Sequence, residues 1–423
     1  MGERVAKGAP LSITEDEVFA QAVDNAGFLW SQRDGAARDP RYDLKGLAEV
    51  DGRLAAQLDL LARGGRAAWD GCAAAAEEGG AGEVFAALSL ALARRDQGDI
   101  AALIARGIDA PAVARGVVSA LGWAAPELVK DVLPALLGAK AEPALRTIGI
   151  AASAVRRRDP GPALKEALSA EDARLRARAL KALGELGYVE GLDDARRALS
   201  AEDEAVRFWA AWSAALLGEA RGVDVLLEIA AGGGALAERA AGVALRRLGP
   251  HAGARWLRGL GESPGTARAA IAGVGALGDP AHVPWLIERM SAPRLARLAG
   301  GALSLITGVE LVREELEGPE LEEAGPSDDP EDEDVGPDPD DGLLWPDAAA
   351  VGRWWARRRG DFAAGKRHLW GRGVDLEGLN EVLRRGSQPA RAAAAIERCF
   401  LRPRLGVFEV RARGEAQRAE LGV

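Results

Sequence analysis

Apolar residues recur three or four positions apart along most of this 423-residue chain, which is the spacing of one face of an α-helix. In an N-terminal block over residues 14–80, Thr14 and Glu17 form a capping-box start. Two antiparallel helices are predicted to follow. Their apolar faces are Val18, Ala22, Val23, Ala26 and Trp30 in the first helix and Leu47, Val50, Leu54, Leu58 and Leu61 in the second.

From residue 81 to residue 308 the apolar pattern repeats. The stretches "LRARALKALGELG" (175–187) and "VRFWAAWSAALLG" (206–218) both open with an apolar residue and Arg, run through alanines and end in Leu-Gly. A shorter amphipathic segment separates the long ones, as at 191–199, 222–230 and 282–290. Glycine after a last turn supplies a left-handed cap. The glycines predicted to end the long helices are Gly122, Gly187, Gly218, Gly249, Gly278 and Gly308.

A period of about 30 residues is typical of stacked helix pairs, because one pair cannot bury its apolar face alone and neighbouring pairs complete the core. The abundance of alanine and leucine and the low aromatic content of 5% suit helices that pack closely. The pattern therefore predicts an all-α fold in which residues 81–308 form a solenoid of about seven repeats.

The net charge of −10 is distributed unevenly. Residues 314–341 hold 15 Asp and Glu and no Lys or Arg, so the rest of the chain is mildly basic. Such a segment cannot bury enough apolar surface to order itself. We therefore expect residues 309–344 to form an acidic disordered linker. One hypothesis is that 314–341 folds over basic residues of the solenoid and screens them, or tethers the C-terminal residues there.

Residues 345–423 form a predicted C-terminal module rich in tryptophan. Two helices are expected over about 375–385 and 387–402, followed by an extended stretch over 406–412. The five aromatic residues that gather at the start of the module are Trp345, Trp354, Trp355, Phe362 and Trp370.

The repeated helix pair resembles a HEAT-like repeat of the short subtype also found in bilin lyases. In that family the second helix of each pair faces the concave side, and Asp and Arg form a ladder between repeats. Asp172 with Arg176, and Asp203 with Arg207, match the ladder at i, i+4 spacing. Arginines without a matching Asp continue it in later repeats at Arg239, Arg268 and Arg297.

The flanking segments "FLWSQRDGAARDPRYDLKGLAEVDGRLAAQLDLL", "GRWWARRRGDFAAGKRHLWGR" and "RAAAAIERCFLRPRLGVFEVRARGEAQ" carry a second resemblance. They are similar to an uncharacterised family of bacterial HEAT-repeat proteins, some of which occur in type VI secretion gene neighbourhoods. This resemblance implies a secretion-associated scaffold or adaptor and brings no chemistry with it.

No residue pattern indicates catalysis, a metal or a cofactor. None of His251, His282 and His368 lies at metal-ligand spacing, and Cys72 and Cys399 are expected to be two buried small side chains. No segment has the length and apolar character of a signal peptide's central region or of a membrane span. We therefore expect a cytoplasmic protein that is not an enzyme and binds neither cofactor nor membrane.

Trp209 and Trp212 give the sharpest indication of a binding surface. When the repeats are aligned on their terminal glycines, these tryptophans stand where the preceding repeat has Arg178 and Lys181. Paired exposed aromatic residues beside basic ones are typical interface anchors. The alternative is that both tryptophans fill space left by small neighbours in an adjacent repeat.

These patterns predict a scaffold or adaptor whose concave face binds a helix or loop of a partner protein. The candidate binding residues are Trp209, Trp212, Arg178, Lys181 and Arg207. A second hypothesis is sequence-tolerant nucleic-acid binding by an arginine-lined groove, although the basic excess of the body is small for that role.

Overall fold

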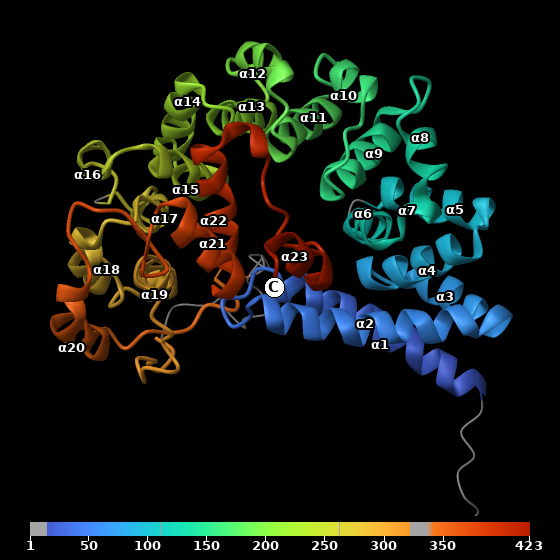
Figure 1. Ribbon diagram of the computed structural model, residues 1–423, viewed down its shortest axis with the longest axis horizontal. Coiled ribbons are helices and arrows are strands. Elements are labelled where there is room, and N and C mark those ends of the chain that lie inside the picture. Colours follow the sequence, from blue (N-terminus) through green and yellow to red (C-terminus); the bar gives the residue numbers. More distant parts are fainter. Residues whose placement is uncertain (1–14, 111, 262, 322–337, 339) are drawn as a thin grey trace, which may run out of the picture. The chain divides into compact units, whose positions relative to one another are not determined.

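The computed structural model describes residues 15–110, 112–261, 263–321, 338 and 340–423. These residues are almost entirely helical, which confirms the prediction of an all-α solenoid (Figure 1). The sheet found among them is one short antiparallel hairpin of β1 (His368–Leu369) and β2 (Arg372–Gly373). Within these described ranges, no helix is both long enough and apolar enough to span a membrane.

The chain divides into two compact units. The first holds residues 1–34 and 49–132, and the second holds residues 35–48 and 133–423. This division follows compactness, whereas the boundaries expected above (14–80, 81–308, 309–344 and 345–423) follow the sequence pattern. Those boundaries therefore stay a prediction.

Helix pairs also form the first unit. Trp30 stacks against Phe85 with ring centroids 6.0 Å apart, and Trp123 meets the edge of Phe85 at 5.9 Å. Cys72 is fully buried, as expected. Thr14, the predicted cap, lies outside the described residues. The helices are α1 (Glu15–Ala36) and α2 (Leu44–Arg63), each of which runs on into the second unit, α3 (Gly65–Glu78), α4 (Ala81–Arg94), α5 (Gln97–Asp109), α6 (Ala114–Trp123) and α7 (Pro126–Val129).

A row of long, alanine-rich helices builds the second unit, and shorter helices alternate with them. The long helices are α9 (Pro143–Val155), α11 (Ala173–Leu186), α13 (Glu204–Leu216), α15 (Ala237–Arg247), α17 (Ala267–Leu277) and α19 (Pro293–Thr307). The short ones are α8 (Val132–Leu136), α10 (Pro162–Ala167), η1 (Val189–Gly191), α12 (Leu192–Ala198), α14 (Ala220–Ala231), α16 (Pro250–Leu257), η2 (Pro280–His282) and α18 (Val283–Arg289).

The repeat alignment predicts the core of this row correctly. Small side chains let the helix axes approach closely, so that the larger Leu and Val side chains of neighbouring helices interlock. Aligning the stretches on Gly187 and Gly218 matches four pairs of apolar positions. The buried ones are Leu175, Ala179 and Leu183 in α11 with Val206, Ala210, Ala214 and Leu217 at the end of α13, whereas Leu186 is only partly buried.

Four of the six predicted glycines have positive φ at the end of a long helix, including Gly218 (φ 95°), which follows Leu217, the C-cap of α13. Gly187, Gly278 and Gly308 are left-handed C-caps of α11, α17 and α19. Gly249 instead precedes α16 with φ −67°. The reason is Pro250, because a residue before proline is confined to extended backbone. The prediction was also wrong for Gly122, which lies inside α6.

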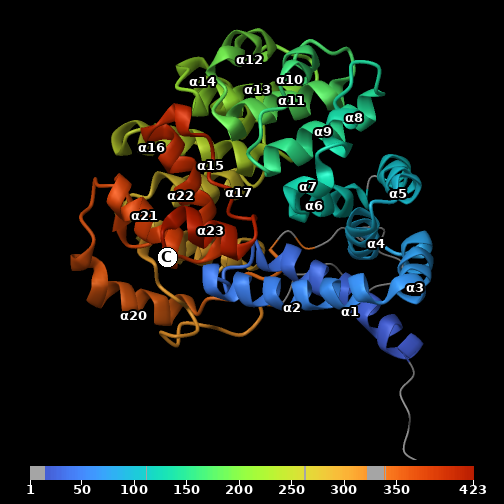
Figure 2. The ribbon, with the colours of Figure 1, turned by 45° about the vertical axis from the view of Figure 1, so that its right-hand side comes forward.

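Three C-terminal helices, α21 (Leu376–Arg385), α22 (Gln388–Leu401) and α23 (Gly414–Leu421), lie on the inner side of the curve that α9 to α19 follow (Figures 1 and 2). α20 (Ala348–Arg358) instead packs against α18. The other C-terminal elements beyond the hairpin are η3 (Arg359–Asp361) and η4 (Pro403–Leu405). α21 and α22 occupy the positions expected from the sequence, whereas the hairpin and α23 were not predicted.

Backbone hydrogen bonds join these residues to the ends of the long helices. The last carbonyls of a helix have no partner within it and need donors from elsewhere. Here the C-terminal chain supplies them. The pairs are His368 N–H with Gly278 O at 2.8 Å, Trp370 N–H with Leu305 O at 2.6 Å, Gly371 N–H with Ile306 O at 2.9 Å and Val407 N–H with Glu185 O at 3.0 Å.

Arg367 and Glu397 add side-chain contacts to this seam. The guanidinium of Arg367 donates to the carbonyls of Leu277 (3.0 Å) and Arg246 (2.7 Å). It also pairs with the Glu397 carboxylate, which accepts a further hydrogen bond from Arg246 at 3.2 Å. Glu397 is 2% exposed. The buried carboxylate thus has two guanidinium partners, which is the condition under which a charge tolerates burial.

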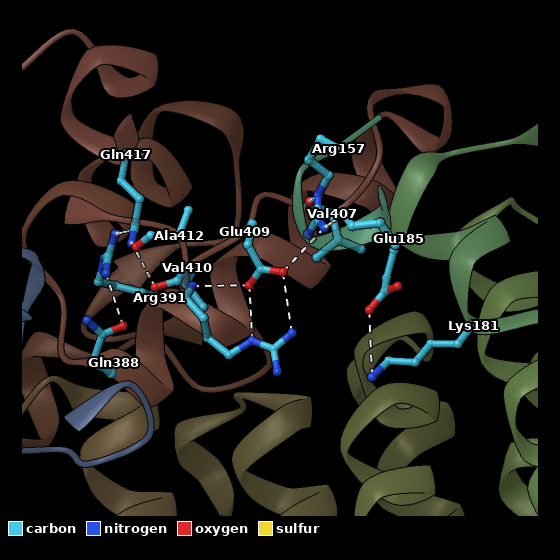
Figure 3. Close-up of polar contacts among 12 residues, drawn as sticks. Arg157, Lys181, Glu185, Gln388, Arg391, Val407, Glu409, Val410, Ala412 and Gln417 are labelled. Carbon is cyan, nitrogen blue, oxygen red and sulfur yellow. Dashed lines mark hydrogen bonds and ion pairs between the residues drawn. The ribbon is translucent and has the colours of Figure 1, made fainter. Parts of the chain in front are cut away.

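A buried arginine holds the C-terminal helices to one another. Arg391 of α22 donates to the Leu383 carbonyl at 2.7 Å and to the side-chain oxygens of Gln388 and Gln417 (Figure 3). Burial lowers the pKa of Arg391 to about 10. The guanidinium stays protonated at neutral pH, and neutral oxygens from α21, α22 and α23 surround it.

Both ends of the predicted linker are part of the fold. Leu311 and Leu316 are buried. The amide of Gly318 donates to the Trp345 carbonyl, and the amide of Asp347 donates to the Leu316 carbonyl, each at 2.8 Å. The segment therefore leaves and returns to the solenoid at one place. Its acidic residues from 322 to 337 lie outside the described residues.

The Gly278→Ala variant should be less stable than Gly218→Ala. Both residues have positive φ, 71° and 95°, so each alanine costs about 1–2 kcal/mol of backbone strain. A Cβ on Gly278 would also overlap the His368 carbonyl oxygen, whereas one on Gly218 would have Pro403 Cγ as its nearest atom, at 4.0 Å. Urea unfolding of both variants measures the difference, and equal losses would contradict the close contact at Gly278.

Candidate protein-binding surface

The two tryptophans predicted to form a binding surface differ in burial: Trp212 is buried in the core, and Trp209 is half-buried. Trp212 is 8% exposed, so the expectation that it leaves the core face is wrong. Its ring covers Gly184 of α11, where a Cβ would lie 2.5 Å from Trp212 Cζ3. The hydroxyl of Ser213 also donates to the Leu180 carbonyl at 2.6 Å. Trp212 therefore fills the space that a small neighbour leaves, which was the alternative reading of the pair.

Trp209 is half-buried, and two cations lie over its indole ring. Lys181 Nζ lies 4.6 Å from the ring centroid, and the guanidinium carbon of Arg239 lies 5.0 Å from it. Trp212 supports the ring edge-on at a centroid distance of 5.4 Å. The face of an indole attracts cations, and the attraction grows where water is partly excluded. Trp209, Lys181 and Arg239 are together called the Trp209 surface.

Glu185 holds the basic residues of α11 in place. Its carboxylate pairs with Arg178 at 2.6 Å, and its side chain is 7% exposed. It also pairs with Lys181 at 3.6 Å (Figure 3). Burial alone would raise the pKa of Glu185, but Arg178 and Lys181 outweigh it and lower that pKa. Burial lowers the pKa of Lys181 to about 8, because Glu185 only partly offsets the loss of solvation. Lys181 is therefore a cation at neutral pH that loses its charge in mild alkali.

A second carboxylate reaches this region from the C-terminal segment. Glu409 pairs with Arg157 at 3.3 Å and with Arg411 at 3.1 Å (Figure 3). Burial alone would raise the pKa of Glu409, but these two guanidinium groups lower it to about 2. Arg157 also donates to the Val407 carbonyl at 2.6 Å. The segment is thus fixed beside α11 by a buried, fully ionised pair.

Positive charge is in excess around Trp209. Arg239 is exposed, and its pKa is lowered by desolvation and by the nearby charge of Arg411. A carboxylate arriving beside Arg239 would relieve that repulsion. The side chains that face this region are Arg157, Arg178, Lys181, Arg239 and Arg411, with Glu185 and Glu409 as their acidic partners.

Arg207 does not join this cluster. Its guanidinium donates to the carbonyls of Ala201 (2.7 Å) and Glu202 (3.2 Å) in the loop before α13. The reason is helix geometry, because residues two apart on a helix do not share a face. Arg207 therefore stabilises the entry to α13, while Trp209 points elsewhere.

The acids of the predicted ladder serve as helix caps. Asp172 accepts the amide of Leu175 at 2.7 Å, and Asp203 accepts the amide of Val206 at 2.8 Å. Within the described ranges, neither acid forms an ion pair with Arg176 or Arg207. A side-chain oxygen at this position satisfies an amide that the first turn leaves without a partner. The arginine of α17 does pair between repeats, because Arg268 Nε lies 2.6 Å from Glu238 Oε1 of α15.

Sequence reasoning missed five residues of the cluster. The sequence pattern indicated Arg239 only as a continuation of the Asp/Arg ladder. Glu185 lies inside a repeat and belongs to no recognisable motif. Arg157, Glu409 and Arg411 reach the site through folding of the C-terminal segment onto the solenoid, and no local pattern signals that contact. For the part of the chain that the structure covers, no group of three or more His, Cys, Asp or Glu side chains is placed to hold a metal ion.

Trp212→Ala should reduce stability far more than Trp209→Ala. Removing the buried Trp212 ring leaves a cavity over Gly184 and costs about 3–5 kcal/mol. Trp209 is half-buried, so its loss should cost no more than about 2 kcal/mol. Chemical unfolding of the single variants measures both values. A larger loss for Trp209→Ala would contradict these positions.

The comparisons with known proteins agree with the helix pairs. The HEAT-repeat family matches residues 161–246, which span α10 to α15 and include Arg178, Lys181, Trp209 and Arg239. No curated protein matches the chain. The repeats that build the Trp209 surface are therefore similar in sequence to HEAT repeats, in agreement with their helix pairs.

Proposed function

We propose that this protein is a non-catalytic scaffold whose Trp209 surface binds an acidic segment of a partner protein. The observation that carries the proposal is the half-buried indole of Trp209, which has both the Lys181 ammonium and the Arg239 guanidinium within about 5 Å of its ring centroid. HEAT repeats generally mediate protein–protein interaction, and they cover this surface.

The basic and aromatic side chains of the Trp209 surface determine which kind of partner segment it can bind. Trp and Arg are the side chains most enriched among residues that dominate binding energy, because they offer large area together with a polar group. Lys181, Arg239 and Arg411 favour carboxylates, and the exposed part of the Trp209 ring favours an apolar or aliphatic neighbour. A partner segment that alternates Glu or Asp with apolar residues satisfies both.

The predicted anchors divide into contacting and supporting residues under this proposal. Lys181 and Trp209 contact the partner. Arg178 orients Lys181 through their shared partner Glu185, Trp212 supports the Trp209 ring, and Arg207 stabilises the start of α13. Arg239 and Arg411 join as contacting residues that sequence reasoning did not select for binding.

A protein partner is favoured over nucleic acid by the modest positive charge of the surface. Glu185 and Glu409 pair with basic residues of the cluster, so the surface lacks the continuous basic stripe typical of nucleic-acid binding. The resemblance to secretion-associated proteins suggests a cytoplasmic component of a bacterial secretion system as the partner. Steep loss of affinity with salt would instead mark nucleic-acid binding.

A labelled oligo-glutamate peptide tests the surface directly, with oligo-glutamine as the neutral control. Trp209→Ala and Arg239→Gln should each weaken binding about tenfold, equivalent to 1.4 kcal/mol. Trp256→Ala and Arg258→Gln are matched controls, because both residues belong to α16 or its cap. Equal binding by all four variants would remove the proposal.

Affinity for the peptide should fall as the pH rises from about 7 to about 9, because Lys181 deprotonates with a pKa of about 8 while glutamates and arginines keep their charge. Arginine remains charged across this range, so Lys181→Arg should bind with little pH dependence. Fluorescence anisotropy at several pH values makes the measurement. An identical pH profile for Lys181→Arg would show that Lys181 does not contact the acidic segment.

A further inference from the structure

A second group of arginines in the solenoid already holds acidic residues. Arg268, at the start of α17, forms two hydrogen bonds with the Asp340 carboxylate, at 2.6 and 2.8 Å. Arg297 of α19 pairs with the carboxylate of Asp338 and donates to the Asp340 carbonyl at 3.2 Å. Both acids belong to the acidic segment, so the chain binds two of its own aspartates here.

An aromatic ring completes this group, as at the Trp209 surface. The guanidinium carbon of Arg297 lies 4.7 Å from the ring centroid of Trp345. Arg268, Arg297 and Trp345 are together called the arginine clamp. Its two charge pairs are partly withdrawn from water, because Asp340 is 4% exposed and the Arg297 side chain is 11% exposed.

The charges of the clamp match its occupant closely. The hydrogen bonds that Arg268 donates to Asp340 raise the pKa of Arg268, despite its partial burial. Burial alone would raise the pKa of Asp338, but the Arg297 guanidinium outweighs it and lowers that pKa. A bidentate arginine–carboxylate pair also fixes orientation, so the clamp recognises the placement of two carboxylates as well as their charge.

Glu238 and Arg239 place the clamp beside the Trp209 surface. Arg268 Nε pairs with Glu238 at 2.6 Å, and the next residue along α15 is Arg239, which covers Trp209. Arg239, Arg268 and Arg297 stand near the starts of successive long helices. An extended acidic segment lying across these helices would meet all three arginines in turn.

The resident aspartates can leave without unfolding the segment. Hydrogen bonds of Leu316 and Gly318 with residues 345–347 anchor its base independently of the clamp. Glu238 remains beside Arg268 when Asp340 departs, so that guanidinium keeps one carboxylate partner.

We propose that Asp338 and Asp340 are an intramolecular ligand of the arginine clamp and compete there with an acidic segment of the partner protein. The proposal rests on the proposed function, because it extends the Trp209 surface to the next two repeats. The partner segment carries carboxylates two residues apart, in the arrangement of Asp338 and Asp340. While Asp338 and Asp340 occupy the clamp, they weaken its binding to the partner segment, and the partner must displace them.

The double variant Asp338→Asn/Asp340→Asn tests the competition with the oligo-glutamate peptide. Its affinity should exceed that of the native chain by about tenfold, equivalent to 1.4 kcal/mol. Asp341→Asn is the matched control, because it removes an exposed charge next to Asp340. Adding Arg268→Gln/Arg297→Gln to the double variant should abolish the gain. Equal affinity of the native chain, the double variant and the control would overturn the competition.

Hydrogen exchange in the native chain gives a test that does not depend on the double variant folding. The Asp340 amide donates to Asp338 Oδ1 at 2.9 Å, and the Leu343 amide donates to the Asp340 carbonyl at 2.9 Å. Saturating peptide should speed exchange of both amides if it displaces the aspartates. Unchanged or slower exchange under peptide binding would contradict displacement.

The outcomes also separate this inference from the proposed function. If Trp209→Ala abolishes peptide binding in every background while Asp338→Asn/Asp340→Asn has no effect, the Trp209 surface stands and the competition fails. If the double variant gains affinity that Trp209→Ala leaves intact, the competition stands and the Trp209 surface fails. If no variant binds the peptide, both proposals fail.

Discussion

The carbonyl groups at the ends of the long helices constrain the whole second unit. Each such end leaves carbonyls without an intrahelical partner, and burying one unsatisfied group costs about 1–3 kcal/mol. The glycine caps of α11, α17 and α19 let another chain segment approach these ends closely. The C-terminal residues take that position, with the amides of residues 368, 370, 371 and 407 and the guanidinium of Arg367 as donors. The repeats and the C-terminal residues therefore stabilise one another.

This arrangement limits where a partner protein can bind. The C-terminal ends of α11, α17 and α19 are occupied by the chain itself, and Glu409 with Arg157 fixes the segment beside α11. Under the proposed function, the partner meets the N-terminal halves of α15, α17 and α19 and the exposed side of Trp209. There the charge is positive, and each cluster of arginines has a tryptophan ring. The acidic segment of the chain already uses part of this surface through Asp338 and Asp340.

The features of the fold that the sequence predicts, buried helix faces and helix ends, are those that depend on the local spacing of apolar residues. The stripe of Leu175, Ala179 and Leu183 identifies a buried helix face without any tertiary information, and Leu-Gly marks the end of α11. The same logic fails at Gly249, where the following proline decides the backbone. It also fails at Trp212, because whether a ring is buried depends on Gly184 in a neighbouring repeat.

The candidate surface was only partly predictable for the same reason. Lys181 and Trp209 belong to consecutive repeats, so aligning the repeats brings them together. Glu409 and Arg157 are separated by most of the solenoid in sequence, and only the docked C-terminal segment joins them. The acidic segment was expected to screen basic residues, and the two arginines that it contacts, Arg268 and Arg297, are two of the three for which the repeat pattern shows no matching Asp.

Native-state hydrogen exchange at the seam between the C-terminal residues and the solenoid tests this account most directly. The amides of His368, Trp370 and Gly371 should exchange only through the same opening that exposes the amides of α17 and α19, with equal free energies. Fast exchange of these three amides, while α17 and α19 stay protected, would show that the C-terminal residues do not cap the helix ends.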